Sequence, residues 1–164
     1  MFPEDIQTQA SNVIAAAARG GVMMATAESC TGGLVAGALT AIPGSSAVLD
    51  RGFVTYSNAS KSEMLGVPTE LITLHGAVSE PVARAMAAGA VARSNAGLAV
   101  SITGVAGPGG GSADKPVGLV HFAVADAAGV EHAVRRFGDI GREAVRLESV
   151  RIALAMLLSR LGAP

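Results

Sequence analysis

One stretch constrains the fold of this chain more than any other: residues 27–33, with the sequence Ala-Glu-Ser-Cys-Thr-Gly-Gly. An apolar run, 22–27, leads into it, and apolar residues at helical spacing follow from Leu34 to Ile42. A strand therefore ends and a helix begins within a few residues. Backbone N–H groups are unpaired at a helix start, and the helix dipole favours negative charge there. A hydroxyl nucleophile, an oxyanion or a bound phosphate would each be stabilised at this turn.

Apolar spacing along the rest of the chain predicts further helices and strands. The predicted elements are, in chain order, a helix from Ile6 that Gly20-Gly21 ends, strand 22–27, helix 34–42, strand 48–56, helix 58–65, helix 79–90, strand 98–103, strand 117–125, strand 130–137 and a final helix 142–161. Asn58 and Ser79 are the expected N-caps of their helices. Helices and strands alternate in the first part of the chain and a hairpin of two strands follows late, an order that favours an α/β fold. We expect one domain over residues 1–164, with three α/β/α layers around a mixed sheet of about five strands.

Composition and charge exclude several classes of protein. Half of the residues are hydrophobic but only 3% are aromatic, which suits closely packed helices on a sheet. The net charge of −1 gives no support for a nucleic-acid partner. The chain has no run of about 18 apolar residues that could span a membrane, and its first residues do not resemble a signal peptide. A single cysteine fits a reducing compartment, so we expect a cytoplasmic protein.

Ser29 is the candidate nucleophile in the turn, although a serine at a helix start most often only caps the helix. A nucleophilic serine needs a base, and histidine is the usual one. No local spacing ties His75, His121 or His132 to this turn, and no pair of them has the spacing of metal ligands. A Ser-His-Asp triad therefore lacks support. Cys30 is an alternative nucleophile or, more simply, a structural thiol.

Lysine offers a better base than histidine. Only two of the twelve basic residues are lysines, and lysine, unlike arginine, serves as a base once its pKa is lowered. Lys61 lies in the first turn of its predicted helix, where the helix dipole and partial burial would both lower its pKa. An exposed helix lysine is the simpler alternative. Lys115 is expected to order the glycine-rich loop beside it. Tyr56 is close enough in sequence to share a pocket with Lys61, or to be a surface aromatic.

Residues 103–112, Thr-Gly-Val-Ala-Gly-Pro-Gly-Gly-Gly-Ser, look like a phosphate cradle. The segment is neither a P-loop nor a dinucleotide-binding fingerprint, because no Gly-Lys-Ser or Gly-Lys-Thr follows and a strand comes next instead of a helix. Glycines also form ordinary flexible turns, so this signal is weak by itself. Arg142 and Arg146, at the start of the last helix, could bind a phosphate or simply face solvent.

Taken together, these segments resemble the CinA C-terminal domain family, the nicotinamide mononucleotide (NMN) amidohydrolases. The matching motifs occur in the family's order and cover nearly the whole chain. They are residues 27–33, 43–46, 52–58 with Lys61, 75–79, 103–110 and 115–118.

The resemblance implies hydrolysis of the NMN carboxamide to nicotinate mononucleotide and ammonia. It assigns a Ser–Lys dyad to Ser29 and Lys61, with Tyr56 supporting the dyad or stacking on the pyridinium ring. Oxyanion donors would come from the turn after Ser29 or from around Ser46. No metal or organic cofactor is implied. The implied substrate-binding residues are Cys30, Gly33, Ser46, Thr103, Gly104 and Arg142, the last on the 5′-phosphate.

One activity found in the family is not expected here, and one alternative function stays open. Some family members carry a large N-terminal domain linked to a pyrophosphatase activity, and this activity is not expected of a chain that resembles the stand-alone form. A non-catalytic module that binds a nucleotide on its glycine-rich turns is the alternative to an amidase. Apolar residues on the terminal helices make a homodimer an expectation as well.

Overall fold

The computed structural model describes residues 1–162 and is built on one five-stranded sheet with the strand order β2-β1-β3-β4-β5. β1 pairs in parallel with β2 and β3, whereas β3, β4 and β5 are antiparallel neighbours. The predicted mixed sheet is thus confirmed. The strands are β1 (Met24–Glu28), β2 (Leu49–Val54), β3 (Leu98–Gly104), β4 (Leu119–Asp126) and β5 (Gly129–Arg136).

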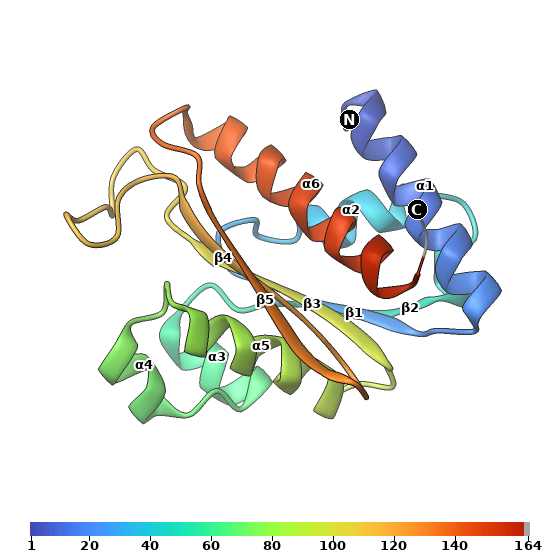
Figure 1. The fold of residues 1–164 in the computed structure, drawn as a ribbon, viewed down its shortest axis with the longest axis horizontal. Helices are drawn as coiled ribbons and strands as arrows, with labels where there is room; N and C mark the ends of the chain where they lie inside the picture. Colours follow the sequence, from blue (N-terminus) through green and yellow to red (C-terminus); the bar gives the residue numbers. More distant parts are fainter. Residues whose placement is uncertain (163–164) are drawn as a thin grey trace.

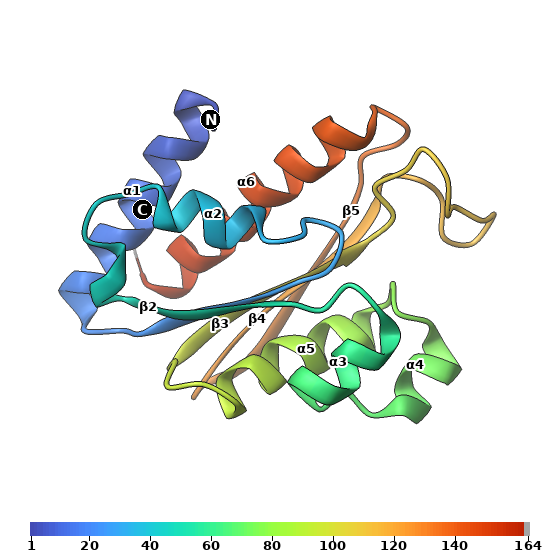
Figure 2. The ribbon, with the colours of Figure 1, turned by 180° about the vertical axis from the view of Figure 1, so that it is seen from behind.

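Helices cover both faces of the sheet (Figures 1 and 2). One layer holds α1, α2 and α6, and the opposite layer holds α3, α4 and α5, which confirms the predicted three-layer α/β/α fold. No helix within residues 1–162 is both long enough and apolar enough to cross a bilayer. The helices are α1 (Glu4–Gly20), α2 (Leu34–Thr40), α3 (Asn58–Leu65), α4 (Thr69–His75), α5 (Glu80–Ala92) and α6 (Arg142–Arg160), with a 3₁₀ turn at Ser45–Ala47.

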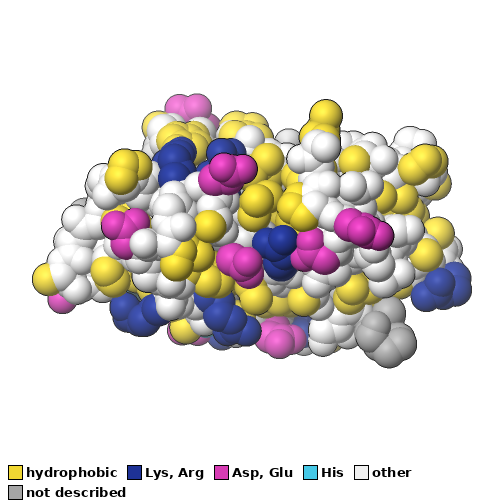
Figure 3. Space-filling model, turned by 90° about the horizontal axis from the view of Figure 1, so that it is seen from above, with side chains coloured by type: hydrophobic (Ala, Val, Ile, Leu, Met, Phe, Trp, Pro, Cys, Tyr) yellow, Lys and Arg dark blue, Asp and Glu magenta, His cyan; other side chains and the backbone are white. Residues whose placement is uncertain are grey.

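Two hydrophobic cores lie on the two faces of the sheet. All five residues of β1 are buried, as expected of a central parallel strand covered on both sides. The first core joins α1, α2 and α6 to the sheet through residues such as Ile6, Leu39 and Leu154. The second joins α3, α4 and α5 to the other face and includes Leu65. Figure 3 looks onto the first helical layer, where acidic and basic side chains are scattered among hydrophobic ones.

The N-terminus of α3 differs by one residue from the prediction. Ser57, and not Asn58, is the N-cap: its hydroxyl accepts a hydrogen bond from the Ser60 N–H at 3.1 Å. The Ser60 hydroxyl in turn accepts one from the Ser57 N–H at 3.2 Å, which completes a capping box. This cap fixes the start of the helix that carries Lys61.

Helix α4 is an element that the apolar spacing of the sequence does not predict. The helix starts directly after Pro68 and ends before Gly76, so His75 closes a helix instead of preceding one. Seven residues give too short an apolar pattern to detect. Ser79 does precede α5 as predicted, but its hydroxyl donates to the Gly76 carbonyl at 2.8 Å and makes no capping bond.

The contact between α3 and α5 depends on Gly89. A Cβ atom at this position would overlap the Leu65 carbonyl oxygen of α3. We therefore expect Gly89→Ala to lower the free energy of unfolding by about 2 kcal/mol, the usual cost of overpacking. Gly97→Ala is the matched control, because no atom lies within 4 Å of its added methyl group. Urea unfolding measures both variants, and equal midpoints would contradict this packing.

Candidate active site

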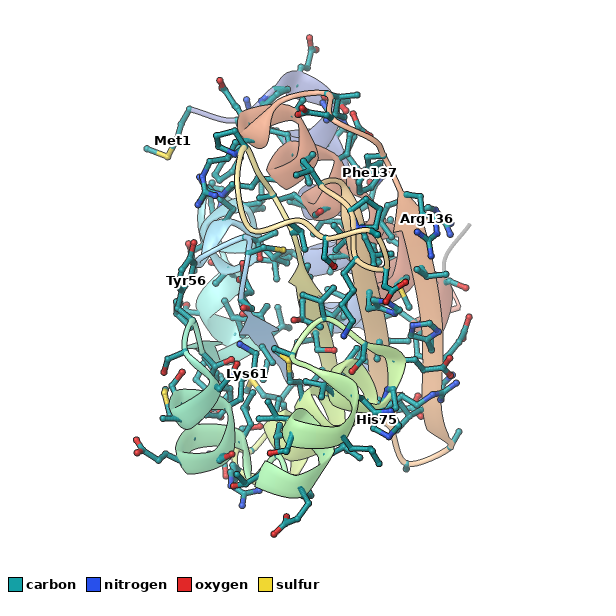
Figure 4. All side chains as sticks on the ribbon, turned by 90° about the vertical axis from the view of Figure 1, so that its left-hand side faces the viewer. Met1, Tyr56, Lys61, His75, Arg136 and Phe137 are labelled. Atoms are coloured by element: carbon teal, nitrogen blue, oxygen red, sulfur yellow. The ribbon has the colours of Figure 1, made fainter. Side chains whose placement is uncertain are left out.

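A cavity of about 280 Å³ opens at the carboxyl ends of β1 and β3. Its walls come from the turn after β1, the β2–α3 connection, the loop before α5, the glycine-rich loop and the start of α6. Figure 4 shows Lys61 inside the molecule and Tyr56 at its side. Seven of the predicted site residues line this cavity: Ser29, Cys30, Tyr56, Lys61, Thr103, Gly104 and Arg142.

Two predicted site residues lie elsewhere. Ser46 is exposed in the 3₁₀ turn before β2 and lines a separate hollow. This turn is at the amino end of β2, whereas the cavity is at the carboxyl ends of the parallel strands. Gly33 lies beside a neighbouring hollow, and its N–H donates to the Glu28 carboxylate. Neither is among the cavity-lining residues described within 1–162.

Ser29 and Lys61 are in direct contact. The Lys61 Nζ lies 3.0 Å from the Ser29 Oγ and 2.7 Å from the Thr55 carbonyl oxygen. The Ser29 N–H donates to the Ile102 carbonyl of β3 at 2.9 Å, so the serine follows directly from the sheet. The Thr55 N–H donates to the Glu28 carbonyl at 2.8 Å, which fixes the acceptor of the lysine to the same edge. Three parallel strands thus hold the pair together.

Burial governs the ionisation of the two reactive groups beside Ser29. Lys61 is 1% exposed, and this burial lowers its pKa from the ordinary value of 10.5, as the sequence analysis expected. Burial also raises the pKa of the Cys30 thiol to about 12. A thiol this weakly acidic stays protonated at neutral pH, which argues against Cys30 as the nucleophile.

The start of α2 is already occupied by an internal anion. The fully buried Glu28 carboxylate accepts hydrogen bonds from the N–H groups of Gly33, Val35 and Ala36 at 2.8–3.0 Å. These groups belong to the first turn, where the helix dipole favours negative charge. These three N–H groups are therefore not available to donate to a bound phosphate. The position of Glu28 in the sequence, next to Ser29 at the end of an apolar strand, does not by itself indicate this role.

Arg142 bridges the mouth of the cavity. Its guanidinium donates to the Gly107 carbonyl at 2.9 Å and to the Tyr56 hydroxyl at 3.1 Å. Tyr56 is 61% exposed, so its ring faces both solvent and the cavity. Thr103 is nearly fully buried and its hydroxyl donates to the Ala77 carbonyl at 2.9 Å. Thr103 therefore ties the loop before α5 to the cavity wall.

Several other sequence candidates have roles away from Ser29. Lys115 donates to the His75 carbonyl, which links the glycine-rich loop to the end of α4. His121 and His132 stack in the β4–β5 hairpin with ring nitrogens 3.0 Å apart, and His132 approaches Glu80 at 3.5 Å. Within residues 1–162, no three His, Cys, Asp or Glu side chains are arranged as metal ligands.

Comparison with known proteins gives a consistent result. A family model described as CinA C-terminal domain matches residues 6–161. The chain belongs to the CinA C-terminal domain family. The crystal structure of the competence/damage inducible protein CihA from Agrobacterium tumefaciens superposes with a TM-score of 0.96 at 58% identity, covering 99% of this chain and 98% of that one. The crystal structure of a CinA superfamily protein from Escherichia coli superposes with a TM-score of 0.90 at 36% identity, covering 96% of this chain and 92% of that one.

Curated relatives in the CinA family come in two lengths. A CinA-like protein of Anaeromyxobacter sp. (strain K) is 54% identical over 146 residues, which are 88% of this chain but 35% of that protein. The chain thus spans about a third of such relatives. The nicotinamide-nucleotide amidohydrolase PncC of Escherichia coli K12 is 53% identical over 137 residues, 84% of this chain and 83% of that one. The resemblance found in the sequence is confirmed.

Replacing Lys61 tests the cost of its burial. Burial lowers the pKa of Lys61 in the folded protein below its value of 10.5 in the unfolded chain. Between these two pKa values the unfolded chain therefore binds more protons than the folded protein. The contribution of Lys61 to the free energy of unfolding consequently rises with pH in this range. We expect the free energy of unfolding of Lys61→Met, minus that of the wild type, to be most positive near pH 7 and to shrink toward pH 10. Denaturant unfolding at each pH measures it.

Leu65→Met is the control for this pH series, since it changes a buried residue of the same helix without changing a titrating group. The difference in free energy of unfolding between Leu65→Met and the wild type should not vary with pH. A Lys61→Met difference that is equally constant would contradict the lowered pKa.

Proposed function

We propose that this protein hydrolyses the carboxamide of nicotinamide mononucleotide to nicotinate mononucleotide and ammonia, with Ser29 as nucleophile and Lys61 as base. One observation carries the proposal: a buried lysine amine lies 3.0 Å from the hydroxyl of a cavity-lining serine. An uncompensated buried charge is costly, so an amine held there favours its neutral form. Membership of the CinA family and the similarity to the Escherichia coli amidohydrolase support the choice of substrate.

The first step is the attack of Ser29 on the amide carbon. Neutral Lys61 keeps one N–H bonded to the Thr55 carbonyl and accepts the hydroxyl proton on its lone pair. As the Oγ–C bond forms, the electron pair of the amide carbonyl moves onto its oxygen. The result is a tetrahedral oxyanion beside a protonated Lys61.

The second step expels ammonia and then restores the serine. Protonated Lys61 gives its proton to the leaving nitrogen as the C–N bond breaks, which leaves an ester on Ser29. Lys61, neutral again, takes a proton from a water molecule that attacks this ester. Collapse of the second oxyanion returns the proton to Ser29 and releases the carboxylate product.

The oxyanion needs donors that the fold has not already engaged. The Ser29 N–H is bonded to Ile102, and the first turn of α2 is bonded to Glu28. Cys30 lines the cavity, and its N–H has no carbonyl acceptor within residues 1–162. The residue after the nucleophile is a frequent source of such a donor. We therefore assign the Cys30 N–H to the oxyanion, together with N–H groups of the glycine-rich loop.

The nucleotide part of the substrate fits the mouth of the cavity. Arg142 would bind the 5′-phosphate, because a guanidinium forms paired hydrogen bonds with phosphate oxygens. The exposed ring of Tyr56 offers a face for the cationic pyridinium ring. We place this reaction in cytoplasmic pyridine nucleotide salvage. A homodimer stays a prediction.

Substitution of the two dyad residues tests the reaction directly. We expect Ser29→Ala and Lys61→Met each to lower kcat for ammonia release from NMN by about 10⁴-fold or more, as for other nucleophiles and bases. Lys61→Arg should be equally impaired, because arginine cannot accept the proton. Arg151→Lys, on the outer part of α6, is the control and should retain activity.

Three outcomes would change the assignment. A wild type that binds NMN without releasing ammonia would replace the amidase with a nucleotide-binding module. Full activity in Lys61→Arg would remove the dyad while leaving the amidase. A loss in Cys30→Ala as large as that in Ser29→Ala would support the thiol as nucleophile.

The pH dependence of kcat/KM reports the ionisation of Lys61 in the free enzyme. Because the base must be neutral and burial lowers its pKa below 10.5, activity should rise with pH through that lowered value and be weak in mild acid. Steady-state rates between pH 5 and 9 measure the profile. A flat profile would count against Lys61 as the base.

A further inference from the structure

Arg146 of α6 points its guanidinium at the backbone of residues 29–33, the nucleophile turn, which carries Ser29. Its Nε donates to the Cys30 carbonyl at 3.1 Å, and a terminal nitrogen donates to the Thr31 carbonyl at 3.0 Å. Within residues 1–162, no carboxylate forms an ion pair with this half-buried guanidinium. By contrast, Arg151 on the same helix pairs with Asp5 and Glu148. Arg146 therefore serves two peptide carbonyls and not another side chain.

These contacts connect to the proposed oxyanion donor through two peptide units. In a trans peptide, the C=O and the next N–H point in opposite directions. Arg146 holds the Thr31 C=O, so the Gly32 N–H points away from it and donates to the Ser29 carbonyl at 3.0 Å. The Ser29 C=O shares its peptide unit with the Cys30 N–H. The direction of this N–H is thus set by a chain of hydrogen bonds that begins at Arg146.

The same chain also strengthens the donor. Each hydrogen bond in a series polarises the next, and the effect is larger in a low-dielectric interior. A guanidinium at the start of the series draws electron density from both peptide units and makes the last N–H a better donor. The Glu28 carboxylate holds the far end of the turn through the N–H groups of Gly33, Val35 and Ala36. Opposite charges thus hold the carbonyls and the N–H groups of one short segment.

We propose that Arg146 is a positioning residue for the hydrolysis. It fixes the turn that carries Ser29 and polarises the peptide unit that donates to the oxyanion, without touching the substrate. The proposal rests on the proposed function. Lysine cannot replace it, because a single ammonium lacks the planar fork that reaches two carbonyls at once.

Kinetics of Arg146→Lys and Arg146→Gln test the proposal, with Arg151→Lys as the matched control on the same helix. We expect kcat for NMN hydrolysis to fall by about 10- to 100-fold in both Arg146 variants, since small misplacement of an oxyanion donor is costly. KM should change by less than about threefold, because the nucleotide is bound at Arg142. Addition of methylguanidinium to Arg146→Ala should partly restore kcat. Arg151→Lys should match the wild type.

Hydrogen exchange separates failure of this proposal from failure of the proposed function. Arg146→Lys should speed exchange in residues 28–34 and leave the rest of the chain unchanged, whether or not NMN is the substrate. If the wild type releases no ammonia, the function is wrong and exchange alone decides the positioning role. Unchanged exchange in that segment, or equal kcat in Arg146→Lys and Arg151→Lys, would overturn the proposal. The proposal would also be overturned if the loss of kcat in the Arg146 variants were explained by a lower melting temperature of those variants.

Discussion

The burial of the Lys61 amine beside Ser29 is the physical constraint around which the candidate active site is arranged. Removing an ammonium group from water is costly, and among residues 1–162 two hydrogen bonds of the amine, to the Ser29 hydroxyl and the Thr55 carbonyl, offset that cost. Both partners are at the carboxyl ends of neighbouring parallel strands, so the sheet brings them to one edge. The lysine comes from α3, and Gly89 lets α5 approach this helix closely. Burial thereby costs stability and lowers the pKa of the Lys61 amine.

The charged groups around this pair have separate tasks. The Glu28 carboxylate occupies the start of α2, a place where a phosphate could otherwise bind. The phosphate of the proposed substrate is therefore assigned to Arg142, which lies at the mouth of the cavity beside Tyr56. Arg146 holds the carbonyls of the nucleophile turn from behind. In the proposed reaction, this division separates phosphate binding at Arg142 from chemistry at Ser29 and Lys61.

Local patterns in the sequence were sufficient for the fold class, and they made Ser29 and Lys61 candidates, whereas their pairing as a dyad came from the family resemblance. Apolar spacing indicated nearly every strand and helix, and the scarcity of lysine singled out Lys61 as a base. The role of Glu28 as the acceptor at the start of α2 could not be read from its position in the sequence. Its three hydrogen bonds to backbone N–H groups form only when α2 packs on the sheet. Arg146 likewise looks like an ordinary charged helix residue until α6 lies against the turn. Ser46 was placed in the site by the family resemblance alone, although it precedes β2 in the sequence and therefore lies at the amino end of that strand.

The central claim is that Lys61 is a buried amine of lowered pKa, and NMR can measure it directly. The chain has only two lysines, so protein labelled with ¹³C and ¹⁵N in lysine gives two side-chain signals, and Lys61→Arg identifies one of them by its disappearance. A titration followed at the lysine Cε and Nζ should show the Lys61 signal changing well below pH 10.5. The same signal titrating at or above pH 10.5 would contradict the account.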